Sequence, residues 1–76
     1  MQRAAARGAV VTMDAQGAWL SVRGHKGIVE YGARVLRLRL NKGVLRIEGE
    51  GLMLESMDGE DVLIGGRVDQ VTVERG

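Results

Sequence analysis

Apolar residues alternate with polar ones along much of this chain, and this period of two limits its fold more than any other feature. In VLRLRLNKGVLRIEG, residues 35–49, three leucines alternate with two arginines before a short polar break. The alternation then resumes from Leu45 to Glu48. Successive side chains of a β-strand point to opposite faces of its sheet, so the pattern predicts strands with one apolar face.

The rest of the composition also favours an all-β fold. The 76 residues include twelve glycines and no proline, and the apolar residues are mainly Val, Leu and Ile. After Ala6, no window has the three- and four-residue apolar spacing of an amphipathic helix without an internal glycine. Clusters of Gly, Asp or Asn separate the alternating runs and indicate turns. We expect a small antiparallel β-sandwich, or a partly open barrel, of about six to seven short strands.

Length and charge limit the domain organisation and the classes of partner. We expect a flexible N-terminal tail at residues 1–8 and a single domain over 9–76. The chain has no cysteine, which excludes disulfides and Cys-based zinc sites. No apolar run approaches the ~20 residues of a membrane-spanning helix, so direct membrane insertion is not expected. The formal net charge of +1 argues against a dedicated nucleic-acid binder.

The polar break near residues 41–44 sets the register of a predicted hairpin. An even loop keeps the apolar residues of both strands on one face, whereas an odd loop turns an arginine into the core. The sequence therefore predicts a turn of two or four residues, with Gly43 at a positive φ. The predicted pairs are Leu40 with Leu45, Leu38 with Ile47, Arg37 with Glu48 and Arg39 with Arg46.

We expect glycine clusters where the residues that face the core change from odd-numbered to even-numbered positions, or back. The apolar positions are odd-numbered at Leu45 but even-numbered at Leu52, so a bulge or tight corner is predicted at residues 49–51. Residues 65–66 are predicted to change the phase again before Val71.

Residues able to carry catalysis are sparse. His25 is the only histidine, and its place in RGHKG predicts a role in a turn, with a functional contact as the less favoured alternative. The glycine-rich pieces lack the pattern of a phosphate-binding loop. Trp19 and Tyr31 are the only aromatic residues, too few for a base-stacking platform. We therefore expect no enzymatic activity, no cofactor and no metal site.

Four segments in series carry a resemblance to a known family. They are HKGIVEYG (25–32), RVLRLRLNKG (34–43), VLRIEGEGLMLESM (44–57) and VLIGGRVDQVTVE (62–74). Together they resemble the YabP/YqfC family of sporulation proteins, and most closely its YqfC branch, over nearly the whole chain. The chain departs from the family in two places: only MQRAAARG stands where a longer, partly helical segment is usual, and VTVERG lacks an aromatic residue often found there.

The resemblance implies a non-enzymatic protein that acts in endospore formation. It implies a place in the cytoplasm of the mother cell, beside a membrane-anchored sporulation protein such as YqfD, through which the chain would reach the forespore membrane. A partner would bind the outward side chains Arg37, Arg39, Arg46, Met53 and Met57, although a merely solvated face is the favoured interpretation for the arginines. Two alternatives remain: a β scaffold that self-assembles into a ring or filament, and, less favoured, a module that binds an anionic polymer.

Overall fold

The computed structural model describes residues 2–6 and 8–75, and these residues form an antiparallel all-β fold, as predicted. No helix that could cross a membrane is found in this part of the chain. Two strands are much longer than predicted, with 16 residues in β6 and 15 in β7. The seven strands in the described residues are β1 (Gln2–Ala6), β2 (Ala9–Met13), β3 (Trp19–Arg23), β4 (Gly27–Tyr31), β5 (Val35–Leu40), β6 (Gly43–Asp58) and β7 (Asp61–Arg75).

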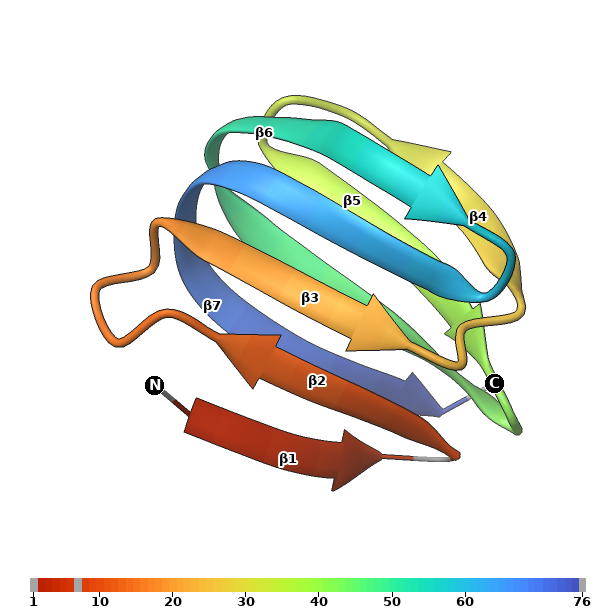
Figure 1. Ribbon diagram of the computed structural model, residues 1–76. Coiled ribbons are helices and arrows are strands. Elements are labelled where there is room, and N and C mark those ends of the chain that lie inside the picture. Colours follow the sequence, from red (N-terminus) through yellow and green to blue (C-terminus); the bar gives the residue numbers. More distant parts are fainter. Residues whose placement is uncertain (1, 7, 76) are drawn as a thin grey trace.

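The described strands form a single sheet in the order β1-β2-β3-β7-β6-β5-β4. The long strands β6 and β7 pair with each other along both halves of the molecule. The first half of β7 pairs with β3, whereas the first half of β6 pairs with β5. The sheet curls over, so its two halves face each other as a front and a back layer (Figure 1). The predicted sandwich is therefore built from one continuous, partly open sheet.

The hydrophobic core lies between the two layers. Leu36 and Leu38 of β5 and Ile47 of β6 are fully buried, which confirms the predicted apolar face of this hairpin. Burying one such side chain contributes ~1.5–3 kcal/mol. The core cluster contains Ala9, Val11, Leu20, Val22, Leu36, Leu38, Leu40, Leu45, Ile47, Leu52, Val62, Ile64 and Val68.

The hairpin between β5 and β6 has an even loop, as predicted, but its register differs. Leu40 pairs with Gly43, so the loop consists of Asn41 and Lys42. The predicted pairs Leu40–Leu45, Leu38–Ile47, Arg37–Glu48 and Arg39–Arg46 are wrong. The observed pairs are Leu38 with Leu45, Leu36 with Ile47, Arg37 with Arg46 and Arg39 with Val44.

The predicted backbone conformation of this loop is also wrong. The positive φ belongs to Lys42, at 58°, and not to Gly43. Gly43 pairs with Leu40 on one side and Arg75 on the other, so it lies within the sheet. A shift of two residues keeps every side chain on its own face, so the hydrophobic pattern could not distinguish the two registers.

The predicted bulge in β6 is present, and it coincides with the bend of the sheet. The register between β6 and β7 shifts between Glu50 and Met53. A Cβ atom at Gly49 would overlap the carbonyl oxygen of Arg67, and a Cβ at Gly66, where φ is 105°, would overlap that of Gly51. Glycine at 49 and 66 therefore lets the two strands approach closely where they bend.

The second predicted phase change is present but lies later in β7. Val68 is still buried, so residues 65–66 do not change the phase. The register passes from Val68 directly to Gln70, which leaves Asp69 as the extra residue of a bulge. Val71 then packs against the core from an odd-numbered position.

Strand β1 occupies most of the segment that the sequence analysis assigns to a tail at residues 1–8. Gln2–Ala6 pairs antiparallel with Ala9–Met13. Its sequence QRAAA has no apolar–polar alternation, so the hydrophobic pattern did not indicate a strand.

Candidate functional site

Two strands run beside each other, and the facing side of each has no neighbouring strand among the described residues. We call the gap between these two strand edges the seam. One edge is β4, Gly27–Tyr31, the last strand of the back layer. The other is formed by residues 52–58 of β6, which in the described chain pair only with β7. The seam is therefore one of the places where the curled sheet does not close into a barrel.

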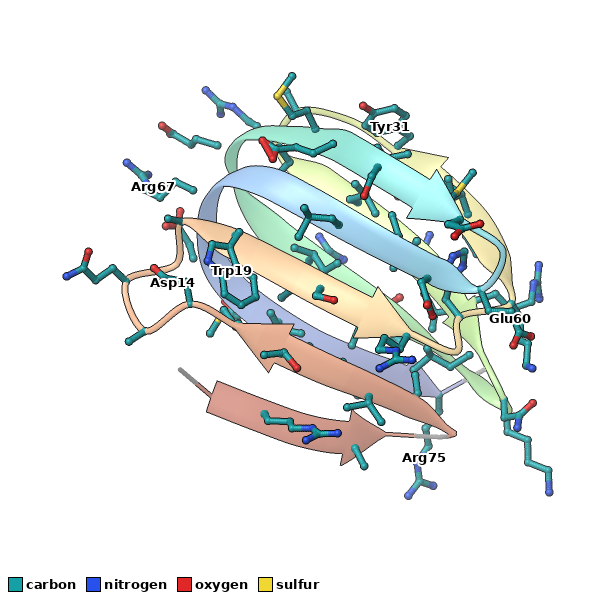
Figure 2. The ribbon with its side chains drawn as sticks, in the orientation of Figure 1. Asp14, Trp19, Tyr31, Glu60, Arg67 and Arg75 are labelled. Carbon is teal, nitrogen blue, oxygen red and sulfur yellow. The ribbon has the colours of Figure 1, made fainter. Side chains whose placement is uncertain are left out.

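The seam is closed at one end and open at the other. At the closed end, the N–H of Leu52 donates to the carbonyl oxygen of Ala33 at 2.8 Å. Two residues further along β6, the N–H of Leu54 donates to the hydroxyl oxygen of Tyr31 at 3.1 Å. Figure 2 shows Tyr31 between β4 and β6. Among the described residues, no hydrogen bond joins β4 to residues 55–58. Among the described residues, the hydrogen bonds across the seam therefore end at Leu54.

Exposed apolar side chains gather along the seam. Ile28 and Tyr31 lie opposite Leu38 and Leu36 in the ladder, so they belong to the core-facing side of β4. They are nevertheless 38% and 56% exposed. This exposure arises because no described strand of the front layer covers them. Met57, on the β6 edge of the seam, is also exposed.

The two exposed methionines of β6 belong to different surfaces. Met57 pairs with the buried Val62, so it faces the inside of the sandwich at the seam. Met53 pairs with Gly65 and faces outward. The extra residue Glu55, at a register shift between Leu54 and Ser56, produces this difference. The prediction that both methionines are exposed agrees with the structure, but only Met53 lies on the outer face.

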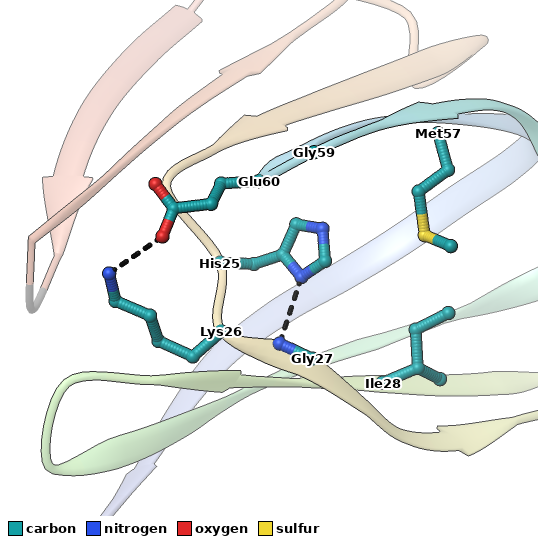
Figure 3. A pocket seen from close by; sticks show the side chains of 7 residues that line it. All are labelled: His25, Lys26, Gly27, Ile28, Met57, Gly59 and Glu60. Carbon is teal, nitrogen blue, oxygen red and sulfur yellow. Dashed lines mark hydrogen bonds and ion pairs between the residues drawn. The ribbon is translucent and has the colours of Figure 1, made fainter.

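A pocket of about 350 Å³ lies at the open end of the seam (Figure 3). Backbone hydrogen bonds fix the loop that forms one side of the pocket. The N–H of His25 donates to the carbonyl oxygen of Glu60 at 3.1 Å, and the N–H of Lys26 donates to the carbonyl oxygen of Arg39 at 2.7 Å. The lining residues are His25, Lys26, Gly27, Ile28, Met57, Gly59 and Glu60. The β3–β4 loop is thereby hydrogen-bonded to the β6–β7 turn and to the end of β5.

His25 is the buried polar group of this pocket, with 4% of its surface exposed. Its Nδ1 accepts a hydrogen bond from the N–H of Gly27 at 3.1 Å, which agrees with the predicted role in the turn. A neutral imidazole has one N–H group and one accepting nitrogen. Because Nδ1 accepts a hydrogen bond, the hydrogen of a neutral ring is on Nε2. The Nε2 atom has no hydrogen-bond partner among the described residues. A buried donor without an acceptor costs about 1–3 kcal/mol.

An ion pair lies on the rim of the pocket. The Nζ atom of Lys26 lies 2.9 Å from Oε2 of Glu60. The hydrogen bond from Lys26 and its positive charge lower the pKa of Glu60 below its ordinary value. Both side chains remain well exposed, so the pair contributes little to stability.

Arg37 and Arg46 lie on the outer face of the back layer, away from the seam. Arg37 Nη2 lies 3.0 Å from Oε1 of Glu74, and Arg46 Nη1 lies 3.6 Å from its Oε2. Arg37 also contacts Glu30, and Arg46 contacts Glu48, at 3.4 and 3.3 Å. The hydrogen bond and negative charge of Glu74 raise the pKa of Arg37.

We call the surface that carries Arg37, Arg39 and Arg46 the arginine face, and two of its three arginines are paired with carboxylates. Arg39 lies opposite Val44 and, in the part of the chain that the structure describes, pairs with no acidic side chain. The predicted contact set of Arg37, Arg39, Arg46, Met53 and Met57 does not form one surface, because Met57 lies at the seam and the arginines on the outer face of the back layer.

Sequence reasoning missed the part that β4 plays in the seam. The run GIVEYG supplies Ile28, Val29 and Tyr31, and its broken alternation is the signal that was available. Which strand edges stay open depends on strand order, and that order does not follow from local patterns. No three His, Cys, Asp or Glu side chains in the described residues are grouped so as to hold a metal ion.

Comparison with known families decides where the chain belongs. The YabP family model matches residues 7–76, which include the seam, the pocket and the arginine face. The chain belongs to the YabP family. Membership in the YabP family is consistent with the sporulation-related role that the four sequence segments imply. A comparison with curated proteins gave no match.

Proposed function

We propose that this YabP-family protein is a non-enzymatic interaction module in endospore formation. It belongs to the YqfC branch, works in the mother-cell cytoplasm, and binds a membrane-anchored sporulation protein that brings it to the forespore membrane. The family match over residues 7–76 and the four segments that resemble the YqfC pattern support this proposal.

The observation that carries the proposal is the open seam. Its exposed apolar side chains lie beside two strand edges that the described chain leaves unpaired. Exposed apolar surface next to such an edge is a feature of protein-binding sites, and natural proteins otherwise cover or charge their strand edges. Covering this surface also stabilises the folded chain, because a partner that binds only the folded state adds to its stability.

A second candidate function is self-assembly into a ring or filament, and the same strand edges favour it. A strand edge of one copy pairs with an edge of the next when both are left open. Size-exclusion chromatography with light scattering separates the two candidates, because a scaffold gives species larger than a monomer and a partner-binding module stays monomeric.

Affinity purification from sporulating cells tests the proposed function. A tagged chain, expressed from its own promoter in its spore-forming host, is cross-linked and purified from the membrane fraction. We expect one membrane-anchored sporulation protein to co-purify, and deletion of the gene to reduce the number of heat-resistant spores. Recovery of the chain without a membrane protein, together with normal spore formation in the deletion strain, would contradict the proposal.

A further inference from the structure

We propose that the open end of the seam binds an extended segment of a protein partner, which adds as a strand to residues 55–58 of β6 and gives a carbonyl oxygen to the Nε2–H of His25. This inference rests on the proposed function only in that it requires a protein partner. It assigns the site, the conformation of the bound segment and one hydrogen bond.

The shape of the seam favours a strand. Its two walls are strand edges, β4 and residues 52–58 of β6, and they are joined at Leu52 and bridged at Leu54. Beyond Leu54, where the hydrogen bonds across the seam end, the edge of β6 presents backbone N–H and C=O groups that an added strand can satisfy. Addition of a peptide strand to an open sheet edge is a common mode of peptide recognition.

The buried imidazole distinguishes an extended peptide from other occupants. His25 is 4% exposed, and its Nε2–H needs an acceptor that the described chain does not provide. An extended peptide carries carbonyl oxygens that are free to accept. A helix uses its carbonyl oxygens internally, and a lipid tail has none. The unmet donor therefore favours a segment whose backbone is not yet hydrogen-bonded.

The side chains at the seam define the sequence that fits. Ile28 and Met57 line the pocket at the open end, on the core-facing side of the two edges, so the side chains of the segment that point to that side, every second one, are apolar. At the open end, Glu60 is paired with Lys26, whereas Asp58 has no basic partner among the described residues. A Lys or Arg near one end of the segment would match Asp58.

Selection from a random peptide library tests the inference directly and does not require the partner to be identified first. Phage-displayed peptides of roughly ten residues, long enough for one strand, are selected against the folded full chain. We expect enriched sequences with apolar residues at alternate positions and a basic residue near one end. Titration of a selected peptide should shift the NMR signals of β4 and of residues 55–58, and should move the Nε2–H signal of His25 downfield.

Matched peptides and variants locate the contact. The same peptide, N-methylated at alternate amides so that one edge loses its backbone donors, should bind at least about tenfold more weakly. Met57→Lys should weaken binding by a similar factor, whereas Met53→Lys, equally exposed but on the outer face, should bind as the wild type does. His25→Asn keeps an acceptor near the Nδ1 position and removes the Nε2–H, so it should weaken binding while thermal unfolding shows a folded protein.

Several results would overturn the inference. They are failure to enrich any peptide, binding that survives N-methylation, and NMR shifts confined to the arginine face. A concentration-dependent dimer that protects the seam would replace the peptide segment with a second copy of the chain. If Met57→Lys still co-purifies with the membrane partner, the inference fails while the proposed function stands. If peptides bind the seam but no membrane protein co-purifies, the proposed function fails while the inference stands.

Discussion

Arg37 and Arg46 lie directly opposite each other on β5 and β6, and the carboxylate of Glu74 on β7 contacts both side chains. Like charges that face each other across a ladder destabilise a sheet. The two oxygens of one carboxylate relieve this repulsion, and Glu30 and Glu48 add further contacts. The arginines therefore have partners within the fold and need no external acidic ligand.

Removal of the charge on Glu74 should destabilise the protein. Glu74→Gln leaves Arg37 and Arg46 facing each other without their shared carboxylate, so we expect thermal unfolding to occur roughly 2–5 °C lower. High salt should reduce the difference, because salt screens exposed charges. Arg39→Gln is the control and should leave the unfolding temperature unchanged. Equal melting of Glu74→Gln and wild type would show that the network is only a solvated face.

Core and surface positions should respond differently to truncation. Leu38→Ala and Ile47→Ala remove fully buried atoms, and each should lower the free energy of unfolding by about 2–5 kcal/mol. Met53→Ala and Met57→Ala change exposed side chains and should cost less than about 1 kcal/mol. Chemical denaturation of the four variants measures these changes. Similar losses at all four positions would mean that the buried face is wrongly assigned.

The hairpin loop should become more stable when its strained residue is replaced. Lys42 has a φ of 58°, a conformation that costs a residue with a Cβ atom about 1–2 kcal/mol. Lys42→Gly should therefore raise the free energy of unfolding by roughly 0.5–1 kcal/mol, after allowance for the greater entropy of glycine in the unfolded chain. Lys42→Val should lower it. A stabilising effect of Lys42→Val, measured by denaturation, would exclude the observed loop conformation.

The ion pair at the pocket rim predicts a pH dependence whose sign follows from Glu60. Its pKa is lowered in the folded state, so its contribution to stability is present above the ordinary pKa of a glutamate. That contribution is lost as the pH falls through the lowered value. Titration of the Glu60 carboxyl group by NMR should show its pKa rising toward the ordinary value in Lys26→Met. An unchanged pKa in this variant would show that Lys26 is not the cause.

The alternation of apolar residues was sufficient to predict the fold class, the buried leucines and the even loop. It could not place the register within the hairpin, because pairing Leu40 with Gly43 or with Leu45 buries the same side chains. For the same reason the sequence predicted Arg39 opposite Arg46, and the shared role of Glu74 was missed. Glu74 lies far from both arginines in the chain, and only the pairing of β6 with β7 brings it beside them.

The seam was beyond sequence reasoning for a different physical reason. A site that consists of missing strand neighbours depends on the order of all the strands in the sheet, here β7 between β3 and β6. The bulge at Glu55, which turns Met57 toward the pocket, has no glycine at that position to indicate it. His25 was correctly placed in a turn, but its burial follows from the hydrogen bonds of the neighbouring loop to Glu60 and Arg39.

In the proposed complex the seam, and not the arginine face, binds the partner. Co-purification of the proposed membrane-anchored partner distinguishes the two surfaces when it is done from sporulating cells that carry Met57→Lys, Met53→Lys or Arg39→Glu in place of the wild type, at equal protein levels. We predict that Met57→Lys loses the partner and forms few heat-resistant spores, while the other two variants keep both. Retention of the partner by Met57→Lys, with its loss from Arg39→Glu, would contradict this claim.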